Sequence, residues 1–201
     1  MDINQAYTGA LEALRKGGTI LYPTDTVWGL GCDATNPSAV KRIFEIKRRD
    51  DSKSLVLLAD SLDMVAKYIR EIPSIAIDLV EVNDMPMTIV YPAAISCEVG
   101  AAGDKWHLAW NCIADDGSVG IRIPSCCEFC IGLVHKLGRP LVSTSANISG
   151  KPAPARFSEI VDEIKGAVDF VVPPSIDRGS TGKPSQIIKL GLRGEVEIIR
   201  K

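Results

Sequence analysis

The sequence predicts an α/β fold: a single domain over residues 1–201, with a twisted, mixed, open sheet and helices packed around it. Two observations lead to this prediction. Short apolar runs typical of buried strands alternate with amphipathic segments typical of helices along most of the chain. No internal repeat, low-complexity tract or linker divides the 201 residues. The hydrophobic content of 46% is enough to build a sizeable core at this length.

The first half of the chain opens with a helix and a strand. Residues 3–16 carry apolar side chains at helical spacing and end at a glycine pair. An apolar run over 18–22 predicts a buried strand. Asn36 and Pro37 supply an N-cap and a first-turn proline, so 37–48 is expected to be helical. Further elements are expected at these positions: a strand at 55–59, helices at 61–69 and 74–82, and a strand at 87–91.

The second half continues the alternation after one irregular stretch. Residues 92–117 are the least periodic part, and we expect a long excursion there with one short strand at about 106–110. A strand is expected at 119–123, and Pro124 and Ser125 open a helix that runs to residue 137. The remaining elements are a strand at 141–145, a helix at 158–165, an extended segment at 168–172, and strands at 185–190 and 196–200.

The stretch Leu-Tyr-Pro-Thr-Asp-Thr-Val-Trp-Gly-Leu-Gly, which begins at residue 21, is the clearest candidate for a ligand loop. Thr24, Asp25 and Thr26 place two hydroxyls and a carboxylate directly after a strand. Gly29 and Gly31 suit a backbone that needs a positive φ or a close approach to a ligand. Loops at strand ends are where α/β proteins usually build their sites. The alternative is a tight strand-to-helix connection with polar decoration.

Composition narrows the class of protein. The formal net charge of −2 does not favour a general nucleic-acid-binding surface, although it leaves a local basic patch open. No apolar run approaches the roughly 20 residues that cross a bilayer, so no membrane partner is expected. The first ten residues lack the basic and apolar regions of a secretory signal. We therefore expect a cytoplasmic protein.

Six cysteines raise the question of disulfides or zinc. Without a secretory signal, disulfides are not expected. Cys127 and Cys130 form a single CxxC, with no second CxxC or histidine pair at zinc-finger spacing. They lie in a stretch expected to be helical, where thiols pack as small apolar groups. Structural thiols are the preferred interpretation, and a metal site is the alternative.

Several common catalytic motifs are missing. The segment from Gly179 to Ser185 resembles a phosphate-binding loop, but its spacing is too short and Pro184 would interrupt the following helix. There is no GxGxxG motif, and the two histidines do not support a Ser–His–Asp triad.

What remains is a set of hydroxyls, amides and cations near strand ends, which suits a polyanion such as a triphosphate. The cluster Lys47-Arg48-Arg49 could instead be a solvated helix C-terminus favoured by the helix dipole. Arg122 is a stronger candidate for a ligand contact than this cluster. Its neighbours Ile121 and Ile123 are expected to face the core, so Arg122 is expected on the other face of the strand.

Four blocks in this order resemble the YrdC-like family, which includes the threonylcarbamoyl-AMP synthases. They read YPTDTVWGLGCDA, KRRDDSKSLVLL, GIRIP and PLVSTSANISGKPAPA. The resemblance runs from about Gly17 to about Arg200. It implies a twisted α/β sheet with a deep, positively charged cavity. It also implies condensation of L-threonine, bicarbonate and ATP to threonylcarbamoyl-AMP and pyrophosphate, with Mg²⁺ held mainly by the ATP phosphates. The product feeds modification of the adenosine beside the anticodon of tRNA.

The resemblance also assigns roles to individual residues. Lys47 and Arg49 match a KxR motif and would be the catalytic residues that bind the ATP phosphates. Thr26 would contact threonine. The other substrate-binding positions that it implies are Lys53 before the next strand, Thr88 and Arg122 on later strands, and Ser143, Ser145 and Asn147 in the serine-alanine-asparagine block. Arg200 matches an arginine near the end of the family domain.

The sequence departs from the family before one strand. Where synthases usually read Trp-Pro-Gly-Pro-x-Thr, residues 83–88 read Asn-Asp-Met-Pro-Met-Thr, and this change is expected in the cavity wall. The segment 96–117 differs as well. Such changes are compatible with the YciO-like branch of the family. The alternative functions are a module that binds tRNA, double-stranded RNA or the ribosome, and another carbamoyl- or acyl-adenylate transferase. As a synthase, the chain would have tRNA-modification proteins that use its product as partners.

Overall fold

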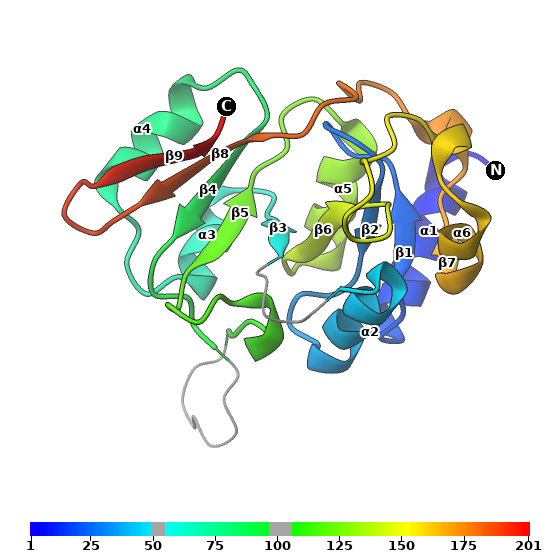
Figure 1. The fold of residues 1–201 in the computed structure, drawn as a ribbon, viewed down its shortest axis with the longest axis horizontal. Helices are drawn as coiled ribbons and strands as arrows, with labels where there is room; N and C mark the ends of the chain where they lie inside the picture. Colours follow the sequence, from blue (N-terminus) through cyan, green and yellow to red (C-terminus); the bar gives the residue numbers. More distant parts are fainter. Residues whose placement is uncertain (50–54, 97–105) are drawn as a thin grey trace.

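The computed structural model describes residues 1–49, 55–96 and 106–201. Within these ranges, nine strands form one sheet in the order β7-β1-β2-β6-β3-β5-β4-β8-β9. Their bounds are β1 Ile20–Tyr22, β2 Gly29–Gly31, β3 Val56–Leu58, β4 Met87–Tyr91, β5 Val119–Arg122, β6 Leu141–Ser145, β7 Phe170–Val171, β8 Gln186–Leu190 and β9 Val196–Arg200. Figure 1 shows β7 near one end of the molecule and β9 at the other, with the connection between β7 and β8 crossing above the sheet.

The sheet is mixed, as predicted. The pairs β1–β7, β3–β5 and β4–β8 are parallel. The pairs β1–β2, β2–β6, β3–β6, β4–β5 and β8–β9 are antiparallel. Together with the helices around it, this sheet confirms the predicted α/β class.

Helices cover the sheet and follow the predicted order. Their bounds are α1 Ile3–Arg15, α2 Pro37–Lys47, α3 Leu62–Tyr68, α4 Ser74–Val82, α5 Glu128–Leu137 and α6 Asp162–Ala167, with 3₁₀ turns at Trp110–Cys112, Phe157–Glu159 and Pro174–Ile176. Side chains cap the first two helices, and Asn36 is the N-cap that the sequence predicted for α2. Asp2 forms a capping box with Gln5, and the Asn36 side chain accepts hydrogen bonds from the backbone of Ser38 and Ala39.

The predicted ligand loop contains a strand that the sequence analysis did not predict. Gly29 and Gly31 lie in β2, between β1 and β6, and neither has a positive φ. The expectation of a positive φ was therefore wrong. Close approach is the real constraint at Gly31, where an added Cβ would lie 2.7 Å from the Tyr22 ring and 2.7 Å from the Val142 carbonyl oxygen. The segment Gly-Leu-Gly is too short and too rich in glycine to be predicted as a strand from the sequence. It is a strand because β1 and β6 pair with it on either side.

Three other elements differ from the prediction. Residues 106–110 do not form a strand: Leu108 makes a single bridge to Ser96, and a 3₁₀ turn begins at Trp110. The helix expected from Pro124 begins only at Glu128, with Cys127 as its N-cap. The predicted helix at 158–165 is divided into a 3₁₀ turn and α6.

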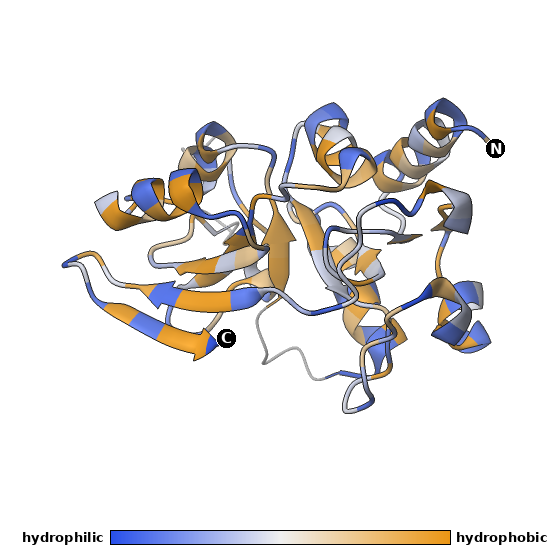
Figure 2. Ribbon diagram, turned by 90° about the horizontal axis from the view of Figure 1, so that it is seen from above, coloured by the Kyte–Doolittle hydropathy of each residue, from blue (hydrophilic) through white to orange (hydrophobic). Residues whose placement is uncertain are grey.

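The core lies between the sheet and the helices. Figure 2 shows hydrophobic residues along the central strands, while each helix carries both hydrophobic and hydrophilic residues. The largest fully buried side chains include Trp28 and Tyr22, which flank the predicted ligand loop. Trp28 also donates a hydrogen bond from Nε1 to Asp177 at 2.7 Å. In the described ranges, no helix is both long and apolar enough to span a bilayer.

We predict that Gly31→Ala destabilises the protein by about 1–3 kcal/mol, because the new methyl group overlaps a buried ring and a backbone carbonyl. Gly166→Ala in α6 is the matched control, since nothing lies within 4 Å of its added Cβ. Urea denaturation of the two variants and the wild type measures the difference. Equal midpoints for Gly31→Ala and the wild type would contradict the close approach.

Candidate functional site

A cavity of about 380 Å³ lies where the loop after β1 meets the central strands and β8–β9. It is lined by Thr26, Val27, Gly29, Arg49, Val56, Arg122, Ser143, Thr144, Ser145, Asn147, Lys151, Ala153, Pro184, Ser185, Ile187 and Arg200. Four of these residues are cations, and none of the described lining residues is an aspartate or a glutamate. The cavity therefore attracts an anionic ligand.

Most of the predicted site residues meet at this cavity. Those that line it are Thr26, Arg49, Arg122, Ser143, Ser145, Asn147 and Arg200. Two others, Lys47 and Thr88, are buried beside it rather than in its lining. Lys53 lies outside the described residues. The loop, the helix end and the strand ends singled out in the sequence thus come together, although they are far apart in the chain.

The loop after β1 is held by its own hydroxyls. The Thr24 hydroxyl accepts a hydrogen bond from the Thr26 amide at 3.1 Å and donates one to the Val27 carbonyl at 2.7 Å. The two threonine hydroxyls are 2.9 Å apart. Thr24 is buried, so its role is to shape the loop, and Thr26 is the hydroxyl that faces the cavity.

Arg122 is tied to the same loop. Its Nη2 atom lies 3.0 Å from Asp25 Oδ1 and donates a hydrogen bond to Thr26 Oγ1 at 3.2 Å. Ile121 and Ile123 line a different cavity on the opposite side of β5, which confirms the expected alternation along this strand. The ion pair between Asp25 and Arg122 joins the loop after β1 to β5, and the Arg122 guanidinium lies at the cavity wall.

The segment that precedes β8 covers the loop from outside. The Thr26 carbonyl accepts hydrogen bonds from the Ser180 hydroxyl at 2.6 Å and the Gly182 amide at 2.8 Å. The Thr181 amide donates to the Asp25 carbonyl at 3.1 Å. The segment that resembled a phosphate-binding loop therefore serves to fix the backbone at 25 and 26.

Ser185 is a cavity residue that the sequence analysis did not assign. Its hydroxyl lies 2.8 Å from the Thr88 hydroxyl, and its carbonyl accepts a hydrogen bond from Arg200 Nε at 2.8 Å. Thr88 therefore acts on the cavity through Ser185. Burial and the nearby positive charge of Arg122 both lower the pKa of Arg200. The only signal in the sequence was the polar run before a strand, and no local pattern reveals a partner 97 residues away.

Lys47 supports the loop after β6 from behind. Its Nζ donates to the carbonyls of Ser145 and Asn147, the latter at 2.8 Å, and to Asn147 Oδ1 at 3.3 Å. Burial, with a smaller contribution from the positive charge of Arg49, lowers the pKa of Lys47 to about 8. These contacts show that the end of α2 is not a solvated helix terminus. Contact between Lys47 and a phosphate stays a prediction, since Lys47 does not line the cavity.

Of the two residues of the KxR motif, Arg49 is the one that faces the cavity. It lines the cavity, and burial lowers its pKa. Arg48 between them adopts a left-handed conformation with φ of 49°, which ends α2 and turns its own side chain to Glu163 at the surface. Of the KxR motif, Lys47 thus lies behind the loop after β6, and Arg49 lies in the cavity wall.

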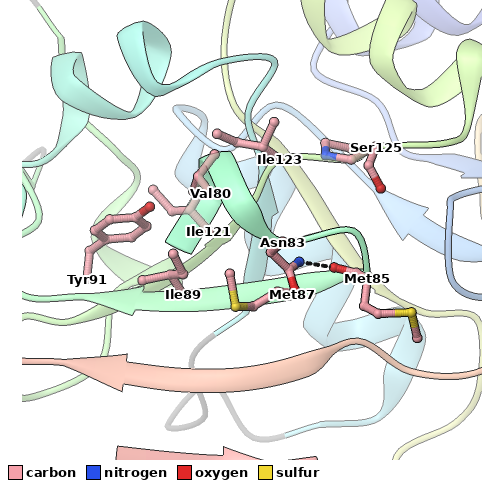
Figure 3. Close-up of a pocket in the computed structure, with 10 residues that line it drawn as sticks. Val80, Asn83, Met85, Met87, Ile89, Tyr91, Ile121, Ile123 and Ser125 are labelled. Carbon is pink, nitrogen blue, oxygen red and sulfur yellow. Dashed lines mark hydrogen bonds between the residues drawn. The ribbon is translucent and has the colours of Figure 1, made fainter. Parts of the chain in front are cut away.

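A second cavity, of about 100 Å³, lies between α4 and strands β4 and β5 (Figure 3). Asn83, Met85 and Met87 line it. Asn83 and Met85 are positions where the sequence departs from the family motif, and we expected the segment 83–88 in the wall of the cationic cavity. That expectation was wrong, because alternation along β4 sends Met87 to the face opposite Thr88, whose hydroxyl meets Ser185.

Neither the cysteines nor the acids form a metal site in the described ranges, where no group of three metal-ligating side chains comes together. Cys127 and Cys130 are free, buried thiols, as the structural interpretation predicted. Cys97 lies outside the described residues.

The chain is similar in sequence and in fold to known proteins. The family model Sua5–YciO–YrdC, described as "Telomere recombination", matches residues 12–201. A threonylcarbamoyl-AMP synthase of Xanthomonas euvesicatoria is 35% identical over 182 residues, which cover 89% of each chain. The structure of P. abyssi Sua5 complexed with L-threonine is 28% identical, with a TM-score of 0.79, over 94% of this chain and 52% of that one. This chain thus spans about half the length of that Sua5.

The E. coli YciO structure has a similar fold. It is 24% identical, with a TM-score of 0.76, and the match covers 100% of this chain and 90% of that one. At this identity, the likeness concerns the fold alone.

We predict that Lys47 makes stability depend on alkaline pH. Its pKa of about 8 in the folded protein is below its ordinary value of 10.5, so the unfolded chain binds more protons between these values. Stability should therefore rise with pH over this range, by up to about 1.4 kcal/mol per pH unit. Urea denaturation at pH 7.5 and 9.5 should show a smaller rise for Lys47→Met than for the wild type. The same rise in both would contradict the prediction.

Proposed function

The chain belongs to the Sua5–YciO–YrdC family, and from this premise we propose that it is an L-threonylcarbamoyladenylate synthase. It would condense L-threonine, bicarbonate and ATP to threonylcarbamoyl-AMP and pyrophosphate. The observation that carries the proposal is the cationic cavity in which Thr26, Arg49, Arg122 and the Ser143–Asn147 block meet. Curated relatives named threonylcarbamoyl-AMP synthase, such as that of X. euvesicatoria, support it.

The lining suits ATP and threonine together. Arg49, Lys151 and Arg200 provide positive charge for a triphosphate, and the hydroxyls of Ser143 and Ser145 provide further donors. Thr26 and Arg122 form a separate polar group, with a hydroxyl and a guanidinium for an amino acid. Magnesium would enter as the complex with ATP, held by its phosphates, and would share the developing negative charge with the arginines.

The reaction needs positioning and charge stabilisation rather than a protein nucleophile. The neutral threonine amine attacks the carbon of bicarbonate, which loses water, or of CO₂, after which the nitrogen releases a proton; both routes form a carbamate. A carbamate oxygen then attacks the α-phosphorus of ATP, and the bond from that phosphorus to the leaving pyrophosphate breaks. Arg49 and Arg200 would stabilise the negative charge on the phosphoryl oxygens and on pyrophosphate. Holding both substrates in one cavity would supply much of the remaining rate.

Lys47 would serve the reaction by holding the loop that carries Ser145 and Asn147. Its three hydrogen bonds to these residues fix the loop. A direct contact with the ATP phosphates, as the family motif implies, would require Lys47 to exchange one of these bonds for the ligand.

The partners of the product follow from the same proposal. Threonylcarbamoyl-AMP would be consumed in the cytoplasm by tRNA-modification proteins that transfer the threonylcarbamoyl group. Binding of tRNA or double-stranded RNA to the chain itself is the competing function, and it would show an affinity that falls steeply with salt.

The proposal predicts pyrophosphate release from ATP, Mg²⁺ and bicarbonate that depends on added L-threonine. Arg49→Ala should reduce this rate by about 100-fold or more, because it removes a cation that faces the phosphates. Arg139→Ala is the control, since Arg139 pairs with Asp33 at 2.9 Å and does not line the cavity. Release that is independent of threonine, or absent while salt-sensitive RNA binding is present, would overturn the proposal.

A further inference from the structure

We infer that Asp25 is a positioning residue that holds the Arg122 guanidinium against the Thr26 hydroxyl and so fixes the threonine end of the cavity. The inference rests on the proposed function for the identity of the substrate. It assigns a task to the one acidic residue of the Thr-Asp-Thr loop, which is not among the residues that line the cavity.

The carboxylate of Asp25 is committed to Arg122. Asp25 is 0% exposed and Arg122 is 4% exposed, so the pair is removed from water. Their ion pair measures 3.0 Å. Among the described residues, neither oxygen of Asp25 has a hydrogen-bond partner besides this contact. A buried charge is costly unless it is paired, and here Arg122 supplies the pairing.

The backbones of Asp25 and Arg122 are both fixed, that of Arg122 by β3 and β4, so the shorter side chain, that of Asp25, orients the longer one. The Thr181 amide holds the Asp25 carbonyl at 3.1 Å, and Gly182 and Ser180 hold the carbonyl of Thr26. Aspartate also has a short side chain with few rotamers. Arginine has a long one, and its guanidinium can adopt many positions unless a partner selects one. The selected position is the one in which the same Nη2 atom donates to Thr26.

Charge explains why the effect should be selective for threonine. Without Asp25, the Arg122 guanidinium loses its negative partner while the other charged lining residues, Arg49, Lys151 and Arg200, are all positive, so it should turn away from Thr26. Removing a negative charge from beside a cationic cavity does not weaken its attraction for the ATP phosphates. Loss of Asp25 should therefore disturb the positions of Thr26 and Arg122, which would bind threonine. The affinity for ATP should stay nearly the same, because the cations that would bind its phosphates are unchanged.

The test compares Asp25→Asn with Asp33→Asn. Asp33 is also buried and paired with an arginine, Arg139, at 2.9 Å, but it lies outside the cavity. We expect Asp25→Asn to raise the KM for threonine about 10-fold or more while the KM for ATP changes less than about twofold. Asp33→Asn should change neither KM. Asp25→Glu keeps the charge but moves it by one methylene group, and it should raise the KM for threonine as well.

Crystal structures of the wild type and Asp25→Asn provide a readout that does not need activity. The Arg122 guanidinium should leave Thr26 in the variant while the backbone stays in place. An unmoved Arg122, or an unchanged KM for threonine, overturns the inference. If the wild type makes no product, the proposed function fails and the structures alone decide the role of Asp25. If Asp25→Asn does not fold, Asp25→Glu decides by the same two measurements.

Discussion

The buried ion pair between Asp25 and Arg122 is the contact on which the geometry of the cavity depends. Strands β1 and β5 have β2, β6 and β3 between them in the sheet. At the usual spacing, strands that far apart would be about 19 Å from each other in a flat sheet. Yet the loop that follows β1 reaches Arg122 at the end of β5. The twist of the sheet and the packing of Tyr22 and Trp28 on either side of the loop make this contact possible.

Positive charge is the second constraint. Four cations line the cavity, none of its described lining residues is acidic, and Lys47 adds a buried cation behind it. Burial lowers the pKa values of Lys47, Arg49 and Arg200, and the positive charge of a neighbouring arginine lowers those of Lys47 and Arg200 further. Clustered cations repel one another and lower the stability of the folded protein, and a bound anion restores that stability. The cavity is thus organised for a highly charged ligand, which agrees with the use of ATP in the proposed reaction.

The sequence predicted the α/β class and most of the site, because both depend on local patterns. Alternating apolar runs marked the strands, and the Thr-Asp-Thr and Ser-Ala-Asn blocks marked the loops that carry Thr26, Ser145 and Asn147. Strand β2 was missed because Gly29 and Gly31 are poor strand formers that only their neighbours stabilise.

The errors at the site share one physical cause, which is long-range contact. The partners of Lys47 lie about a hundred positions along the chain, so its place behind the loop could not be predicted. Ser185 was missed for the same reason, since Thr88 and Arg200 give it its role. Conversely, the altered segment at 83–88 was expected in the wall of the cationic cavity, but Asn83 at the end of α4, Met85 and Met87 line the second cavity instead.

The central claim is that one cavity joins threonine, a one-carbon unit and AMP. Its most direct test is mass spectrometry of the product formed from ATP, Mg²⁺, L-threonine and ¹³C-labelled bicarbonate. The account predicts a single adduct that contains threonine and AMP and carries one ¹³C atom. An adenylate without the label, or no adduct under conditions in which ATP binds, would contradict it.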